Sequence, residues 1–507
     1  MNEKPSINKS LILPILFTIQ AALFMFLSAE LSAQNRQISF PRIEPDPKAL
    51  EFNNKIIRNP DLSWAELGEL SLWASGDTSL SNLQKIRDAV ASLNNSELPS
   101  SAKEKAEFIL GFMHTNLLRT YSIYQTRIDT IFTNGRYNCV SSAVLYTILC
   151  KSAGIRTSGV VTKEHAFVIV HINDQNIDVE TTNRYGFDPG NRKEFHDQFG
   201  RLTGFSYVPA HNYRDRQTIN QIELVSLILH NRIAEHERTS RFNEAVPLAS
   251  DRAALLMGSS FSDNSFESGS SLFENPVIDL IERMVNYGAS LLRSNREEEA
   301  LTWAAAAPPI FASSARWQEF LFATANNRIA RFVKDKKPLD ARAFLENKKN
   351  LFTPQVYSQL DSTVMDAELL FRANNIRNAA EGDSVVNDID QARRNSRLPE
   401  NRGEELLVFA IQKTASALCA APEMNWRAAV NYLEKAVSLY GKNNELEKNI
   451  QLYRGNIASD YHNRFAAEWN KRNIEEAERI LSEGLAEFPG DRLLLSDLEI
   501  VRKYRSQ

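Results

Sequence analysis

Strand-like sequence in this 507-residue chain is confined to one short stretch, and that restriction most narrows the folds open to it. Residues 159–162, 166–172 and 177–181 are rich in Val, Ile, Phe and Thr, and a polar, turn-forming run separates the last two. Residues 139–153, just before them, carry apolar side chains at helical spacing. We therefore expect one helix that leads into a small antiparallel sheet.

Helical patterns occupy most of the remaining chain. Three amphipathic segments, residues 62–73, 83–93 and 102–118, precede the predicted sheet. After about Tyr213 the strand signals vanish, and most segments up to the C-terminus have helical periodicity. The fold class that we predict is α+β, with a helix and a small antiparallel sheet as the core, followed by an all-α region.

Two segments of this all-α region are similar to each other. Residues 427–441 and 475–489 each begin with an Ala-containing triplet, continue with apolar residues at helical spacing and end at a Gly or a Pro. Small residues where two helices cross, with a breaker at the exit, are typical of a helical solenoid. The segments resemble tetratricopeptide repeats, but Ala429 and Ala477 lie 48 residues apart, and the family period is about 34. We predict degenerate repeats of this kind, with an irregular helical bundle as the alternative.

The first 33 residues have the features of an export signal. Lys4 and Lys9 precede an apolar run of 17 residues, 11–27, and small residues follow it as a cleavage site. A membrane-spanning helix needs about 20 apolar residues, so a cleaved signal peptide is favoured over an N-terminal anchor. We expect an exported protein of the periplasm or cell envelope, in contact with a membrane only if this segment is retained.

Composition suggests the remaining boundaries. Residues 34–48 are polar and contain three prolines, so we expect a linker. Residues 49–215 are predicted to form the α+β domain with its N-terminal helices, and residues 216–507 the helical-repeat region. The Ser- and Gly-rich run 258–275 is predicted to be a flexible loop within that region.

Charge and motif content exclude several classes of function. Lys and Arg number 59 against 63 Asp and Glu, for a net charge of −4, and no basic stripe is present. Nucleic acid is therefore not expected as a partner. The sequence has no Cys-x-x-Cys or His-Glu-x-x-His spacing and no Gly-rich phosphate loop after a strand, so we expect neither a metal nor a cofactor.

Cys139 is the cysteine best placed for chemistry. It falls in the first turn of the predicted helix, just after Asn138, a residue type that commonly caps helices. Free backbone N–H groups and the positive end of the helix dipole stabilise a thiolate there, and the same groups can face an oxyanion. Cys150 lies 11 residues further along the helix, roughly 16 Å away, too far for a disulfide to Cys139. We interpret Cys150 and Cys419 as core thiols, with a disulfide between these two as the alternative.

A nucleophilic thiol needs a base and a group that orients the base. His165 opens the second predicted strand, and the paired strand brings Asp178 and Glu180 to one face because strand side chains alternate. His171 shares the strand face with His165 and competes for the role of base. Because His171 lies nearer the hairpin turn, we expect it to be an edge residue.

The stretches YNCVSSAVLYTILCKSAGI and EHAFVIVHINDQNIDVETTN, within residues 137–183, resemble the core of the transglutaminase-like superfamily. That family has a papain-like arrangement with a Cys at the start of a helix, a His at the start of a strand and an acid on the next strand. The resemblance implies Cys139 as nucleophile, His165 as base and Glu180 as the acid. Asp178 stays open as the acid, because Asp is the usual residue there.

The resemblance also implies an activity. A Cys139 thiolate would attack the carbonyl carbon of a protein or peptide amide, and either water or an amine would resolve the thioester. If water resolves the thioester, the protein is a hydrolase, either a peptidase or an amidase. If the amine of a lysine resolves it, the protein is a transglutaminase. The sequence departs from the family pattern in having Glu180 for Asp and Asn176 where a Trp is common. The alternative is a catalytically inert scaffold whose helical repeats bind a protein partner.

Overall fold

The computed structural model of this chain describes residues 40–190, 193–204, 206–209, 212, 215–258, 275–420 and 424–506. The predicted signal peptide or anchor, residues 1–33, and almost all of the predicted loop 258–275 lie outside these residues. The chain divides into two compact units, which meet in sequence between Ser290 and Leu291. Each unit is described by itself.

A four-stranded antiparallel sheet with the strand order β5–β4–β3–β6 lies at the centre of the first unit. Its strands are β3 (Arg156–Val161), β4 (Ala166–Ile172), β5 (Gln175–Val179) and β6 (Gln217–Ile219). The last strand corrects our expectation that strands end before Tyr213. Its three residues are too few for an alternating pattern to be visible in the sequence.

A second, two-stranded parallel sheet precedes the helix that carries Cys139. Its strands are β1 (Thr120–Tyr121) and β2 (Arg136–Tyr137), in which Tyr121 is the register partner of Tyr137. Only Asn138 separates the end of β2 from the first residue of that helix.

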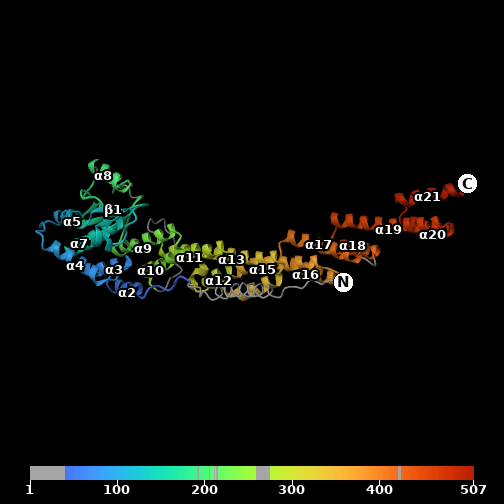
Figure 1. The fold of residues 1–507 in the computed structure, drawn as a ribbon, viewed down its shortest axis with the longest axis horizontal. Helices are drawn as coiled ribbons and strands as arrows, with labels where there is room; N and C mark the ends of the chain where they lie inside the picture. Colours follow the sequence, from blue (N-terminus) through green and yellow to red (C-terminus); the bar gives the residue numbers. More distant parts are fainter. Residues whose placement is uncertain are drawn as a thin grey trace, which may run out of the picture. The chain divides into compact units, whose positions relative to one another are not determined.

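Figure 1 shows the helices of the first unit, some of which contact the larger sheet. They are α2 (Pro47–Arg58), α3 (Trp64–Ala74), α4 (Leu80–Asn94), α5 (Ala102–Asn116), α6 (Asp129–Asn134), α7 (Cys139–Ser152), α8 (Lys193–Thr203), α9 (Gln221–Arg238), α10 (Phe242–Met257) and α11 (Pro276–Arg293).

Helix α7 is buried along almost its whole length. Every residue from Cys139 to Cys150 is buried, as expected for a helix that is apolar all round. It packs on one face of the sheet, against β3 and β4, and also contacts α3, α5 and α9. The first turn is held by a capping box. In this box the Oδ1 atom of Asn138 accepts from the backbone N–H of Ser141 at 3.0 Å, and Ser141 Oγ accepts from the N–H of Asn138 at 2.9 Å.

The opposite face of the sheet has its own small core. Phe167 and Ile169 of β4 point to this face, whereas their neighbours Ala166 and Val168 pack toward α7. Aromatic residues cover Phe167 and Ile169 from α8 and the segment after it, namely Phe195, Phe199 and Tyr207.

The first unit continues beyond residue 215, where we predicted the helical-repeat region to begin. Helix α9 packs against α3, α7 and β3. Its residues Leu224 and Ile228 belong to the same buried cluster as α7. Helix α9 and strand β6 therefore complete the α+β core, and the compact unit extends to Ser290.

The described part of the predicted linker, residues 40–48, is packed against α10. Arg42 forms an ion pair with Asp251 at 3.0 Å, the backbone N–H of Asp46 donates to the same carboxylate at 2.7 Å, and Ile43 is buried. Helix α2 already begins at Pro47. Over these residues the predicted linker is therefore a packed segment, and its last proline lies in the first turn of a helix.

The second unit, as far as it is described, consists of helices. They are α12 (Glu297–Ala304), η3 (Pro309–Ser313), α13 (Ala315–Lys334), α14 (Pro338–Lys348), η4 (Lys349–Leu351), α15 (Pro354–Asn374), α16 (Ala379–Arg394), α17 (Glu400–Leu418), α18 (Trp426–Tyr440), α19 (Asn444–Asn470), α20 (Ile474–Glu487) and α21 (Arg492–Arg505).

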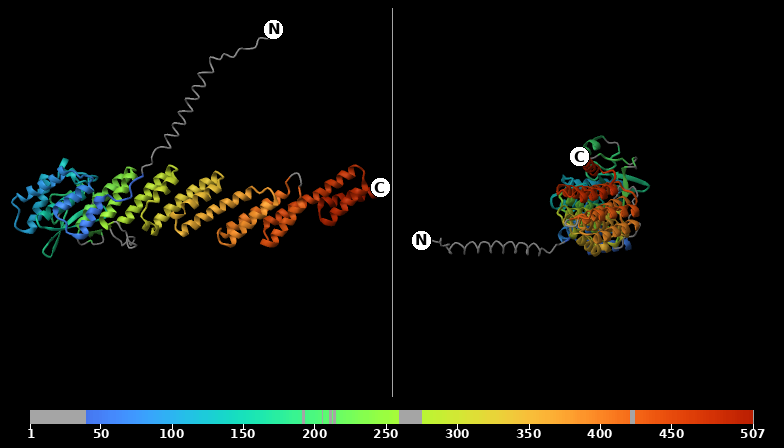
Figure 2. Two further views of the ribbon diagram at one scale, coloured as in Figure 1. Left: turned by 90° about the horizontal axis from the view of Figure 1, so that it is seen from below. Right: turned by 90° about the vertical axis from the view of Figure 1, so that its right-hand side faces the viewer.

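These α-helices are stacked as successive antiparallel pairs, drawn from yellow to red in Figure 2. From α12 to α21 each α-helix contacts the next, and α13, α15, α17, α19 and α21 also contact one another in turn. The two similar segments of sequence form α18 and α20. Helix α19 between them is 27 residues long, which accounts for a spacing greater than that of tetratricopeptide repeats. Within the described ranges, no helix combines the length and the hydropathy needed to cross a bilayer.

Candidate active site

Cys139 is the first residue of α7 and is 9% exposed, so its thiol lies at the boundary between the core and a pocket. Asn138 before it is buried, and its Nδ2 donates to the backbone oxygen of Ile123 at 3.2 Å. The N–H groups of the first turn of a helix have no acceptor within the helix. The backbone N–H groups of Cys139 and Val140 therefore flank the sulfur as donors for negative charge.

His165 and Glu180 form a buried pair. His165 immediately precedes β4, Glu180 follows β5, and Nε2 of the imidazole lies 2.7 Å from Oε2 of the carboxylate. The other carboxylate oxygen, Oε1, accepts from the backbone N–H of Thr182 at 3.1 Å and from its hydroxyl at 2.7 Å. Both oxygens of the fully buried Glu180 thus have donors, which fixes the carboxylate against the imidazole.

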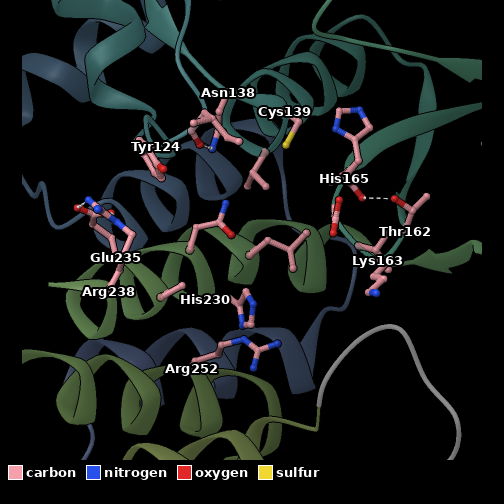
Figure 3. A pocket seen from close by; sticks show the side chains of 18 residues that line it. Tyr124, Asn138, Cys139, Thr162, Lys163, His165, His230, Glu235, Arg238 and Arg252 are labelled. Carbon is pink, nitrogen blue, oxygen red and sulfur yellow. Dashed lines mark hydrogen bonds and ion pairs between the residues drawn. The ribbon is translucent and has the colours of Figure 1, made fainter. Parts of the chain in front are cut away.

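The imidazole also faces Cys139. Figure 3 shows the sulfur and the ring on the same side of the pocket. Glu180 occupies Nε2, which leaves Nδ1 for the thiol, and the charge of Cys139 acts on the imidazole. Burial lowers the pKa of His165, but the charges of Glu180 and Cys139 and the hydrogen bond to Glu180 outweigh it and raise that pKa to about 10.

Asp178, the alternative acid, has other partners. Its two oxygens accept from the Nη1 and Nη2 atoms of Arg216 at 2.7 and 2.8 Å, and the hydroxyl of Tyr207 donates to Oδ2 at 2.6 Å. Glu180, not Asp178, is the carboxylate that contacts His165. Arg216 comes 38 residues later in the sequence, so no local pattern distinguishes the two acids.

The loop after Glu180 folds back on it. The backbone N–H of Glu180 donates to the carbonyl of Gly186 at 2.8 Å, and that of Gly186 donates to the carbonyl of Asn183 at 3.0 Å. A Cβ atom at Gly186 would lie 2.0 Å from the backbone oxygen of Glu180. Only glycine allows this approach, so the loop holds the carboxylate in place.

His171, the competing base, lies apart from this group. Its Nε2 is 2.8 Å from the hydroxyl of Ser158, and its Nδ1 is 2.7 Å from Oδ1 of Asn176. The structure therefore brings together Cys139, His165 and Glu180, and gives Asp178 and His171 different neighbours.

A pocket of about 570 Å³ opens beside Cys139 and His165. One face of α9 forms its wall, with side chains at helical spacing from Leu227 to Arg238. His230 and Arg252 lie on the side away from Cys139 (Figure 3). The sequence analysis missed this wall, because its mixture of apolar, amide and charged residues has no pattern beyond helical spacing.

Two tyrosines lie behind the site. The ring centroids of Tyr121 and Tyr137 are 5.8 Å apart, and Tyr137 donates to the carbonyl of Thr182 at 3.2 Å. Burial and the charge of Glu180 raise the pKa of Tyr137 to about 12. Burial and the charges of Cys139 and Glu180 likewise raise the pKa of Tyr121, whose buried hydroxyl has no hydrogen-bond partner among the described residues.

Among the described residues, the thiols of the other two cysteines have no imidazole or carboxylate as a hydrogen-bond partner. Cys150 is fully buried, and burial raises the pKa of its thiol. Cys419 is half-buried beside the core of α17 and α18, and burial raises its pKa as well. Both are free, so the alternative of a disulfide between them is wrong. Over the described ranges, no group of three or more His, Cys, Asp or Glu side chains is placed to hold a metal ion.

Comparisons with known proteins identify no family. No protein-family model matches the sequence, and no curated protein matches it. A crystal structure of menin, which reveals the binding site of that protein for the Mixed Lineage Leukemia (MLL) protein, aligns with 82% of this chain and 97% of its own. The identity is 11% and the TM-score 0.29, and a likeness at that level carries no argument about fold or function.

Proposed function

We propose that this protein is an exported, thiol-dependent acyl-transfer enzyme with a papain-like, transglutaminase-like core, acting on protein or peptide amides. The observation that carries the proposal is the position of Cys139 and of the His165–Glu180 pair at one open pocket. A nucleophile, a base and a group that orients the base are the parts that nucleophilic catalysis requires.

The raised pKa of His165 supports a protonated imidazole at neutral pH, which is the proton donor that the proposed reaction needs. In the proposed reaction the Cys139 sulfur attacks the amide carbon, and the backbone N–H groups of Cys139 and Val140 receive the developing oxyanion. His165 gives its proton to the departing amine as the C–N bond breaks. Water, or the amine of a lysine, then attacks the thioester and gives its proton to His165, which restores the protonated imidazole.

The pH dependence of alkylation tests this proposal. An ordinary cysteine thiol ionises near about pH 8.5, whereas a thiolate paired with an imidazolium reacts well below that value. We expect iodoacetamide to modify Cys139 at about pH 6 and His165→Ala to remove this low-pH reaction. Mass spectrometry of each cysteine peptide measures the rates, and Cys419, which is half-buried and free, serves as a control within the same chain.

Two results would contradict the enzyme and favour the inert scaffold. One is a Cys139 that reacts no faster than Cys419 at low pH, and the other is a rate that His165→Ala leaves unchanged. If the thiolate is present, profiling exported proteins and cell-wall fragments with the wild-type protein and Cys139→Ala identifies substrates. Incorporation of a dansyl-labelled amine into the same substrates separates transamidation from hydrolysis.

The proposed partners follow from the two units. The substrate peptide would bind along the face of α9 that lines the pocket, and a protein partner would bind the stacked helices of the second unit. Export and a location in the periplasm or cell envelope rest on residues 1–33, which lie outside the described part of the chain.

A further inference from the structure

A second nucleophile, base and orienting group lie on the sheet, separate from Cys139. Ser158 of β3 and His171 of β4 point to the same sheet face, and the hydroxyl of Ser158 is 2.8 Å from Nε2 of His171. The opposite ring nitrogen, Nδ1, is 2.7 Å from Oδ1 of Asn176 on β5. Because an amide oxygen only accepts, Nδ1 carries the proton and Nε2 is free to accept from the serine hydroxyl.

Ser158 and His171 also line a cavity of about 670 Å³, distinct from the pocket beside Cys139. Arg156, the register partner of His171 on the neighbouring strand, lines the same cavity. Its side chain is exposed and forms no ion pair with any described residue. The rest of the lining is mixed. Ile56, Leu256 and Met257 are among its apolar residues, and Asp61, Gln221 and Glu223 are among its polar ones.

We propose that Ser158, His171 and Asn176 form a second acyl-transfer site that hydrolyses carboxylic esters with an apolar acyl group. The apolar residues of the cavity would receive the acyl chain, and Arg156 supplies a positive charge for the oxyanion. Ser158 attacks the ester carbon as His171 takes the hydroxyl proton at Nε2. The carbon–oxygen bond to the alcohol breaks, and the alkoxide takes that proton from His171.

Water completes the cycle. It attacks the acyl group on Ser158, gives a proton to His171 and releases the carboxylic acid, and His171 returns the proton to Ser158. A neutral amide stabilises an imidazolium less well than a carboxylate does. With Asn176 as the orienting residue, we expect the site to hydrolyse esters with good leaving groups and not to hydrolyse amides.

Fluorophosphonate labelling of the full chain tests this site. The Cys139→Ala variant serves as the background, so that no label or ester turnover comes from the thiol. We expect mass spectrometry to find the label on Ser158 and not on Ser152, which is also half-buried but whose hydroxyl donates to the carbonyl of Leu149 at 2.8 Å. Turnover of p-nitrophenyl butyrate should be lost in Ser158→Ala and fall about 100-fold in His171→Gln.

The Asn176→Asp variant separates catalysis from a structural hydrogen-bond ladder. A carboxylate at this position stabilises the imidazolium, so labelling of Ser158 should become about tenfold faster or more, whereas Asn176→Leu should slow it. If the hydrogen bonds among these three residues only join the strands, Asn176→Asp should not speed up the labelling of Ser158. Absence of label on Ser158, a rate unaffected by His171→Gln, or no acceleration in Asn176→Asp with unchanged thermal melting would each overturn the proposal. None of these results bears on Cys139.

Discussion

At the scale of single residues, the charge of His165 depends on Glu180. Replacing Glu180 with Gln removes the negative partner, and burial then disfavours the imidazolium, so the pKa of His165 should fall from about 10 toward or below 6.5. In the wild-type protein the stability that comes from this protonated ring is fully present below pH 6.5 and is lost as the pH rises through about 10. In Glu180→Gln we expect the stability of the protein not to fall in this way above neutral pH. Histidine ¹⁵N NMR and thermal melting against pH measure the two effects.

A neighbouring carboxylate provides the control for this prediction. Glu164 is exposed and precedes His165 in the sequence, so Glu164→Gln removes the same charge without touching the ring. We expect the titration of His165 to be unchanged in that variant. An equal shift in both variants would mean that net charge, and not the buried pair, sets the pKa.

The two tyrosines behind the site should respond in opposite ways to loss of the hydroxyl. Tyr121→Phe removes a buried hydroxyl that has no partner among the described residues, so we expect the free energy of unfolding to rise by about 1 kcal/mol. Tyr137→Phe removes the hydrogen bond to Thr182 and should lower it by about 1 kcal/mol. Urea unfolding of both variants measures the difference. A loss of stability in Tyr121→Phe would show that its hydroxyl has a partner such as a bound water.

The sequence places Cys139 and His165 because each stands at the start of a recognisable element. It does not separate Glu180 from Asp178, since both point to one face of a strand. Their roles differ through contacts that are distant in sequence or lie in an irregular loop. Arg216 and Tyr207 bind Asp178, and Thr182 binds Glu180.

At the scale of elements, the loop that follows β5 should be as necessary as the carboxylate that it holds. Gly186→Ala places a Cβ atom against the backbone oxygen of Glu180, so the loop and the carboxylate must shift. We expect low-pH alkylation of Cys139 to slow by about 10- to 100-fold. The matched control is Gly111→Ala in α5, where a Cβ atom meets nothing within 4 Å. An unchanged alkylation rate in Gly186→Ala would mean that the loop does not position Glu180.

Elements long enough to show a period were predictable from the sequence. Strand β4 spans the predicted residues 166–172, and α7 differs from the prediction only by ending one residue earlier. Strands β1, β2 and β6 have two or three residues each, and their backbone hydrogen bonds depend on partners brought from elsewhere in the chain. Local pattern carries no information about such pairings, so these strands were missed.

At the scale of the whole molecule, the first unit should fold without the second. The buried cluster around α7 contains only residues between Ala49 and Leu255. We expect a fragment of residues 40–293 to melt cooperatively and to keep the low-pH reactivity of Cys139. Circular dichroism and alkylation measure both properties.

A fragment that ends at the boundary first predicted, residue 215, is the matched comparison. It lacks β6 and the buried side chains of α9, among them the four apolar residues Leu224, Val225, Ile228 and Leu229. Their burial contributes about 6 to 12 kcal/mol, as much as the whole stability of a typical domain, about 5 to 15 kcal/mol. We expect residues 40–215 not to fold. Cooperative melting of this shorter fragment would mean that α9 is an addition to a core that is already complete.

Two sides of helix α9 have different roles, one in the core and one in the wall of the pocket. Leu224 and Ile228 face the interior, whereas Ala234, Glu235 and Arg238 line the space beside Cys139. Exchanges on the second side alter which molecules fit there and leave the interior untouched. Substitutions at every third or fourth position on that side should therefore change the shape of the pocket at little cost to folding.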